Sequence, residues 1–205
     1  KDGKVDGGAG LLGDSGDKKI IGNSTPRYNY GITLDASWNG IDISAFFQGV
    51  GKRDIAVGGP YFWGATGGVW GSTGFVDHMD YFRTETSPFG ANTDAYYPRP
   101  IIGKDQERNH EVQSGYLQSA AYLRLKNLQI GYTFPTAWMN KVGIQSLRLY
   151  VSADNLFTIT NMAGMFDPET ISGREYWDLD GTDEDKTANN GKVYPLSKVL
   201  SFGLN

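Results

Sequence analysis

The feature that most constrains this chain is an alternation of apolar and polar side chains with a period of two, repeated in five stretches. In residues 146–160, SLRLYVSADNLFTIT, one set of alternate positions is apolar and the other is polar. Successive side chains of a β-strand point to opposite faces, so this pattern predicts a strand with one dry and one wet side. The apolar positions are Leu147, Leu149, Val151, Ala153, Phe157 and Ile159. The alternation does not say whether the dry side faces a protein core or lipid.

Four other stretches show the same alternation. Residues 28–38 and 41–48 are separated by Asn39-Gly40, a dipeptide typical of a hairpin turn with positive φ at both positions. In residues 122–134 the apolar phase shifts near Lys126-Asn127, which predicts a β-bulge with one extra residue. Residues 199–204 alternate at the end of the chain. The sequence therefore predicts an all-β antiparallel fold.

The connections between these strands alternate in length. Those at 39–40 and 135–145 are short, the second with room for one helical turn in TAWMNKV, whereas those at 51–115 and 161–194 are long. Short turns at one end of a meander and long loops at the other are typical of outer-membrane β-barrels. The run 28–38 also has the length of a membrane-spanning strand, with aromatic residues at both ends. The alternative is a soluble β-sandwich, which has the same periodicity.

Composition narrows the classes further. With 13% aromatic residues, 28 glycines and 20% charged residues, the chain favours strands and turns over helical bundles. A net charge of −4 gives no electrostatic case for binding nucleic acid, and the lack of cysteine excludes disulfides, thiolate metal sites and a cysteine nucleophile. The sequence contains no apolar run of about 18 residues, so it predicts no transmembrane helix. Because five strands cannot close a barrel, we expect the chain to be a piece of a longer protein.

Several ordered motifs resemble one known family. They are TPRYNYGITLDASWNGIDISAFFQGVGKRD, AYYPRP, YLQSAAYLRLKNLQIGYTFP, LRLYVSADNLFTITNMAGMFDPE and YPLSKVLSFGLN. Together they are similar to the C-terminal part of SusC/RagA-type TonB-dependent outer-membrane transporters of Bacteroidetes-like bacteria, over residues 2–205. The chain departs from the family in two ways: it has no plug domain or TonB box, and it stops at Asn205, a few residues before the usual terminal aromatic.

The resemblance implies an up-and-down barrel of 22 strands with a plug in its lumen, of which this chain supplies about five strands. It implies import of oligosaccharides or oligopeptides across the outer membrane, energised by a TonB–ExbB–ExbD complex that acts on the missing N-terminal part. A SusD-like surface lipoprotein would close over the mouth, and transporter–lipoprotein pairs can form dimers. A soluble glycan-binding β-module is the alternative function, and no nucleophile–base pair or paired carboxylates indicate an enzyme.

On this interpretation the chain divides into six parts. They are an extracellular loop at 1–26, a hairpin at 27–51, a long extracellular loop at 52–115, two strands with a periplasmic turn at 116–160, an extracellular loop at 161–194 and a last strand at 195–205. The apolar face of 147–159 then lies against lipid. Arg148, Tyr150 and Asp154 face the lumen and are candidate substrate-binding residues.

An aromatic and glycine-rich stretch, GGPYFWGATGGVWGSTGF at 58–75, supplies two further candidates, Trp63 and Trp70. Exposed rings here, with Tyr61 and Phe62, could stack on a sugar or contact the lipoprotein. The alternative is that the rings pack on one another, because a long loop needs a small core of its own.

Three shorter motifs carry weaker signals. GDSGD at 13–17 is similar to a serine-protease segment but has no upstream histidine, so a surface turn is the preferred interpretation. DGKVD at 2–6 resembles part of a calcium-binding loop without its other ligands; a structural Ca²⁺ here is the one cofactor we consider. DLDGTDEDK at 178–186 is interpreted as a solvated acidic loop.

Overall fold

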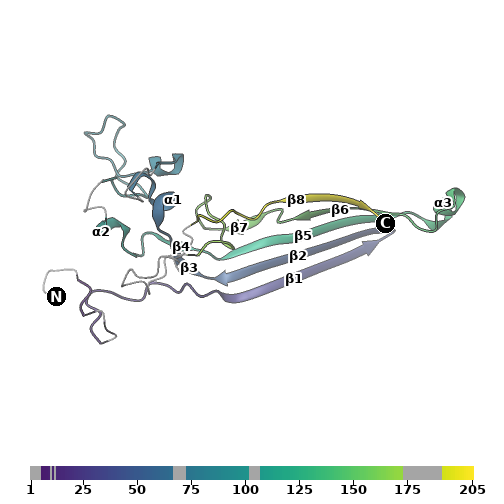
Figure 1. Cartoon of the computed structure of the whole chain (residues 1–205), viewed down its shortest axis with the longest axis horizontal. Helices are drawn as coiled ribbons and strands as arrows, with labels where there is room; N and C mark the ends of the chain where they lie inside the picture. The colour runs from purple at the N-terminus through teal and green to yellow at the C-terminus, as the bar shows by residue number, and fades with distance from the viewer. Residues whose placement is uncertain (1–5, 10, 12, 67–72, 102–106, 173–190) are drawn as a thin grey trace.

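The predicted strands form one antiparallel sheet in the computed structural model of the chain, which describes residues 6–9, 11, 13–66, 73–101, 107–172 and 191–205 (Figure 1). Its strands lie in the order β1-β2-β5-β6-β8, and the short β7 pairs with β5. Their bounds are β1 Arg27–Trp38, β2 Ile41–Lys52, β5 Tyr122–Thr133, β6 Arg148–Asp154, β7 Thr158–Thr160 and β8 Val199–Leu204. Three of these strands, β1, β2 and β5, have 12 residues each, enough to cross a bilayer at a tilt.

Two local predictions are confirmed. The turn between β1 and β2 has Asn39 at φ 48° and Gly40 at φ 85°, the left-handed pair that a tight hairpin turn requires. The β-bulge lies in β5, where the register with β2 passes from Phe46 opposite Asn127 to Phe47 opposite Leu125 and leaves Lys126 without a partner in β2.

The strand predicted over 146–160 is broken into β6 and β7. Asn155 interrupts it with φ 51°, a left-handed conformation that asparagine tolerates better than most residues. The main chain still follows β5 across the break, because Asn155 N–H donates to the Lys126 carbonyl at 3.1 Å and Leu156 N–H to the Leu125 carbonyl at 3.2 Å. The break therefore lies opposite the bulge. The last strand is also shorter than expected and begins at Val199.

The register gives the sheet one apolar and one polar face. Across the strands, residues with the same facing form rows. One apolar row is Ala36, Ile43, Ile130, Val151 and Phe202, and the polar row beside it is Asp35, Ser44, Gln129, Ser152 and Ser201. In the apolar row Ile43, Ile130 and Val151 expose 41%, 46% and 42% of their surface. A soluble sandwich would bury these side chains, so the sandwich interpretation is wrong.

The connections separate as predicted, with the long ones at one end of the sheet and the short ones at the other (Figure 1). The short end holds the Asn39-Gly40 turn and one helical turn, α3 Thr136–Met139 followed by the 3₁₀ turn η4 Asn140–Val142. Among its described residues, the long end holds a small sheet, β3 Asp54–Ala56 with β4 Leu117–Ser119, and four short helical segments. These are α1 Gly59–Trp63, η1 Gly64–Thr66, η2 Val76–Met79 and α2 Glu107–His110.

In the described part of the chain, no helix has the length and hydropathy needed to cross a membrane.

Candidate functional site

The polar face of the sheet carries an ion pair that spans three strands. Arg148 of β6 donates to the carboxylate of Asp42 in β2, from Nε to Oδ1 at 3.0 Å and from Nη2 to Oδ2 at 2.5 Å. Gly131 of β5 lies between them, and a Cβ there would come 2.5 Å from Nη2 of Arg148. Glycine at this position therefore lets the arginine lie flat across β5 to reach its partner.

The two other predicted residues of this face are also engaged. Tyr150 lies 5.2 Å from the Arg148 guanidinium and covers Gly203 of β8, where a Cβ would collide with its ring. Asp154 accepts a hydrogen bond from Asn127 Nδ2 at 2.8 Å. The structure thus places Arg148, Tyr150 and Asp154 on one face, as predicted, but fixed by neighbouring strands. They form an ordered polar wall with both charge signs.

A second charged cluster was missed by the sequence analysis. Arg124 of β5 is 4% exposed and donates to Asp167 at 2.6 Å, Glu169 at 2.9 Å and the Thr158 hydroxyl at 2.7 Å. Lys126 Nζ, at the bulge, adds an ion pair with Glu169 at 2.9 Å. The two carboxylates lie more than 40 residues from Arg124 in the sequence, so no short sequence motif predicts the cluster. It fastens the chain after β7 to the polar face of β5.

Asp167 also joins the two ends of the connection between β7 and β8. Its Oδ1 accepts the Glu169 N–H at 2.9 Å, and its Oδ2 accepts the Leu196 N–H at 3.1 Å. Burial raises the pKa of this carboxyl, but the Glu169 amide, the Arg124 guanidinium and the Leu196 amide outweigh it and hold the pKa below its ordinary value. The ionised carboxylate is thus a clamp at the base of this connection.

The long-connection end has a hydrophobic core of its own. Phe62 is 0% exposed and makes ring contacts with Tyr97, Tyr116 and Phe166, which come from three other segments. Trp63 is 8% exposed and stacks on His110 with ring centroids 4.4 Å apart. Of the two alternatives, the structure shows packing for Phe62 and Trp63, which the loop buries in its own core.

The remaining aromatic candidates of this stretch differ in position. Tyr61 and Phe75 are exposed and stack on each other at 5.9 Å. Trp70 lies outside the described residues.

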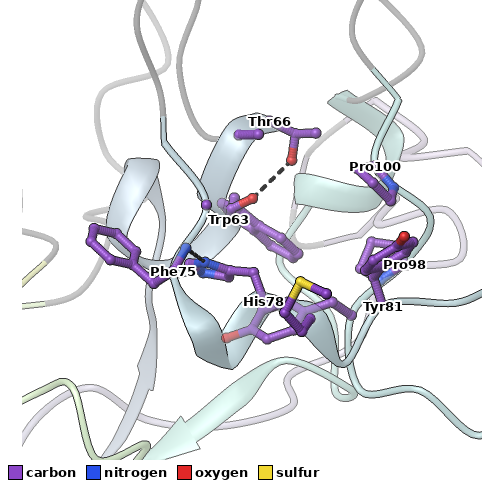
Figure 2. A pocket seen from close by; sticks show the side chains of 11 residues that line it. Trp63, Thr66, Phe75, His78, Tyr81, Pro98 and Pro100 are labelled. Atoms are coloured by element: carbon purple, nitrogen blue, oxygen red, sulfur yellow. Dashed lines mark hydrogen bonds between the residues drawn. The ribbon is translucent and has the colours of Figure 1, made fainter. Parts of the chain in front are cut away.

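Beside this core lies a cavity of about 210 Å³ (Figure 2). The buried rings of Trp63 and Tyr97 line it, together with His78, Thr66, Pro98 and Pro100. Its rim includes the more exposed Ala65, Phe75 and Met79. The cavity therefore combines a buried aromatic floor with an accessible rim.

Two polar side chains of the cavity wall, His78 and Thr66, have hydrogen-bond partners inside the protein. The Phe75 N–H donates to Nδ1 of His78 at 2.9 Å, and Nε2 of the same ring lies 3.1 Å from the Phe62 carbonyl. The Thr66 hydroxyl donates to the Trp63 carbonyl at 3.0 Å and lies 3.2 Å from Nε2 of His110. Burial, with the neighbouring Tyr96 and acidic groups, raises the pKa of Tyr97 to about 12, so its phenol stays neutral. The described residues that line the cavity include no Asp, Glu, Lys or Arg.

The short motifs have structural roles where they are described. GDSGD forms a turn, in which Lys18 N–H donates to the Ser15 carbonyl at 3.0 Å. The carboxylates of Asp14 and Asp17 accept the backbone N–H groups of Ala9 and Asp6, each at 3.1 Å. Within the described residues no group of three or more His, Asp or Glu side chains could hold a metal ion. Residues 2–5 and 178–186 lie outside the described residues, so the Ca²⁺ and the acidic loop stay predictions.

Comparison with known proteins places this geometry in context. No family model matches the chain. It is 33% identical over 192 residues to TonB-dependent receptor P3 of Formosa agariphila, which covers 92% of this chain and 17% of that relative. TonB-dependent receptor P26 of the same organism is 23% identical over 220 residues, covering 100% of this chain and 20% of the relative. The chain therefore spans only about a fifth of the length of these relatives.

Among solved structures, the chain is similar to the RagAB peptide transporter, with a TM-score of 0.63 and 24% identity over 91% of this chain and 18% of that one. The RagAB peptide importer in the 'closed-closed' state gives a TM-score of 0.57 at 24% identity, with the same coverage of both chains. At this level of identity the likeness concerns the fold.

Proposed function

The chain belongs to the TonB-dependent receptors of the bacterial outer membrane, and on this premise we propose that it forms part of the barrel wall of a nutrient importer. The observation that carries the proposal is the two-faced sheet. Its apolar rows are exposed across the strands β1, β2, β5, β6 and β8. Contact of such a large apolar surface with water is unfavourable. Lipid removes this cost, while the opposite face presents serines, amides and ion pairs suited to a hydrated interior.

The open edges of the sheet support the same assignment. β1 and β8 are its first and last strands, and each offers unpaired main-chain groups along one side. Such edges are not viable in lipid unless further strands pair with them. We propose that the rest of the polypeptide provides those strands, and that its N-terminal part connects the barrel to a TonB–ExbB–ExbD complex.

The long connections are proposed to lie outside the cell, where they would meet a SusD-like surface lipoprotein. This partner is supported by the SusC/RagA-type motifs and by the fold shared with the RagAB importer. The exposed Tyr61 offers a large ring with little conformational entropy to lose, as interfaces favour. A dimer of transporter–lipoprotein pairs follows from the same resemblance.

The cargo is proposed to be an oligosaccharide or an oligopeptide. Arg148, Tyr150 and Asp154 on the polar face would contact it during passage, and their charges of both signs favour neither class of cargo. The relatives are receptors and importers, which supports a transport protein rather than an enzyme.

Deletion of the gene in the native bacterium tests the function. We expect uptake of at least one class of fluorescent oligosaccharide or oligopeptide to fall to the background level and to return with the wild-type gene. Uptake in the wild type should also stop when the proton gradient is collapsed. Unchanged uptake of both cargo classes in the deletion strain would contradict the proposal.

A further inference from the structure

We propose that the cavity beside Trp63 binds one apolar side chain of an oligopeptide, which makes peptides the cargo class of this receptor. The inference rests on the proposed importer function and goes further by choosing between its two classes of cargo. The shape of the cavity, the hydrogen-bond partners of its polar groups and its volume each support the inference.

The shape is that of a cup that a side chain can enter. Trp63 and Tyr97 form its floor and are 8% and 7% exposed, whereas Phe75 and Met79 on its rim are 44% and 57% exposed. Figure 2 shows the rings of Trp63, His78 and Tyr81 arranged around the same space. A group entering past the rim would thus exchange water for aromatic surface, which is favourable for an apolar group.

Hydrogen bonding argues against a sugar. A sugar ring carries a hydroxyl on almost every carbon, and each hydroxyl that leaves water needs a new partner. In this cavity both nitrogens of His78 and the hydroxyl of Thr66 are already paired with main-chain groups or with His110. These groups cannot serve a sugar without leaving their present partners. Among the described lining side chains this leaves at most the hydroxyls of Tyr81 and Tyr97 and the indole N–H of Trp63 for the several hydroxyls of a sugar ring. An apolar side chain makes no such demand.

The size fits a single side chain. An apolar cavity of about 150 Å³ holds a benzene molecule. The present cavity, at about 210 Å³, accommodates a phenylalanine or leucine side chain but not a whole oligosaccharide. Because the described lining offers no Asp, Glu, Lys or Arg to pair with a charge, the chosen residue of the peptide would be uncharged. The main chain of the peptide would stay at the rim, beside Phe75 and Met79.

Photo-crosslinking of the full-length receptor, purified in detergent, tests this inference. The probe is a glycine–serine peptide with one photo-leucine, whose diazirine labels whatever residues surround it. We expect mass spectrometry to locate the label on the cavity residues. A competing peptide with phenylalanine at the same position should suppress labelling, whereas the serine peptide and a maltooligosaccharide should not.

A pair of Ala→Trp variants makes the test specific. Ala65 lies at the rim and is exposed, so Ala65→Trp fills the cavity without entering the loop core. Ala91 is equally exposed but does not line the cavity, so Ala91→Trp is the matched control. Because burying one large apolar side chain is worth about ten- to hundredfold in affinity, Ala65→Trp should weaken labelling by at least about tenfold and Ala91→Trp should not.

The outcomes separate this inference from the importer proposal. Equal competition by the serine and phenylalanine peptides, or equal labelling of both variants, overturns the peptide side-chain site even if cells import a cargo. Loss of labelling on addition of the maltooligosaccharide also overturns it and favours a glycan. Specific labelling in detergent together with unchanged uptake in the deletion strain would support the site and contradict the importer.

Discussion

Phe62 shows how single residues organise the long-connection end. It is fully buried and contacts rings from segments near residues 97, 116 and 166, so it holds these segments together. The sequence placed Phe62 and Trp63 in an aromatic stretch, where packing and ligand contact were both open. Only the long-range contacts decide between them, and no local pattern encodes those contacts.

The Phe62→Ala variant should therefore loosen this end without disturbing the sheet. Removing a buried phenylalanine costs about 3–5 kcal/mol, because its contacts are lost and a cavity remains. Limited proteolysis of the purified full-length receptor should cut the variant faster within residues 54–120. Phe89→Ala is the control, since Phe89 is 72% exposed. Equal cleavage of both variants would show that Phe62 is not the centre of this core.

The stability of the connection after β7 depends on pH through the carboxyl group of Asp167. Its pKa is lower in the folded protein than in the unfolded chain, so the ionised clamp stabilises the connection fully above the ordinary aspartate pKa, about 3.9. This stabilisation is lost as the pH falls through the lower, folded value. The protection of residues 161–172 against hydrogen exchange, expressed relative to the intrinsic exchange rate at each pH, should therefore fall at such acidic pH in detergent.

Asp167→Asn should show faster exchange already at pH 7, because one carboxylate oxygen and the charge facing Arg124 are lost. Asp94→Asn, at an exposed position in another loop, is the control and should behave as wild type. Protection in Asp167→Asn equal to that of the wild type at pH 7 would rule out the clamp.

At the scale of elements, the strands show which features are local. The hairpin and the bulge were predicted because each depends on neighbouring residues: the Asn39-Gly40 turn for the hairpin, and the shift of the apolar phase near Lys126-Asn127 for the bulge. The break at Asn155 was not, because the apolar alternation fails only at Asn155 and Leu156 and resumes in the same phase at Phe157. The short strands β3 and β4 were also missed. They are separated by the 60 residues 57–116, and neither strand is long enough to show a period.

The facing of β6 gives a direct prediction. Leu149 belongs to the apolar face, in a row with Tyr132 and Leu204, whereas Ser152 lies between Gln129 and Ser201 on the polar face. Arginine in contact with lipid costs about 2–4 kcal/mol near the midplane. Leu149→Arg should reduce the amount of heat-modifiable, folded receptor in outer-membrane fractions, and Ser152→Arg should leave it near the wild-type level. Similar losses from both substitutions would contradict the assigned facing.

For the whole molecule, the central claim is that the sheet crosses the outer membrane with its long connections outside and its short turns in the periplasm. The claim unites the alternating connection lengths, the exposed apolar rows and the membership of the TonB-dependent receptors. The proposed orientation rests on the resemblance to SusC/RagA-type transporters, which implies that the barrel ends in the periplasm. The strand β8 then runs inward, which places the connection before it outside.

Cysteine labelling of intact cells tests this claim most directly. Ala91 in a long connection and Asn140 in the short turn are both exposed in the structure, and this chain has no native cysteine. A maleimide that cannot cross the outer membrane should therefore label Ala91→Cys in intact cells and Asn140→Cys only after permeabilisation. Labelling of Asn140→Cys but not Ala91→Cys in intact cells would reverse the orientation, and equal labelling of both would contradict a membrane between them.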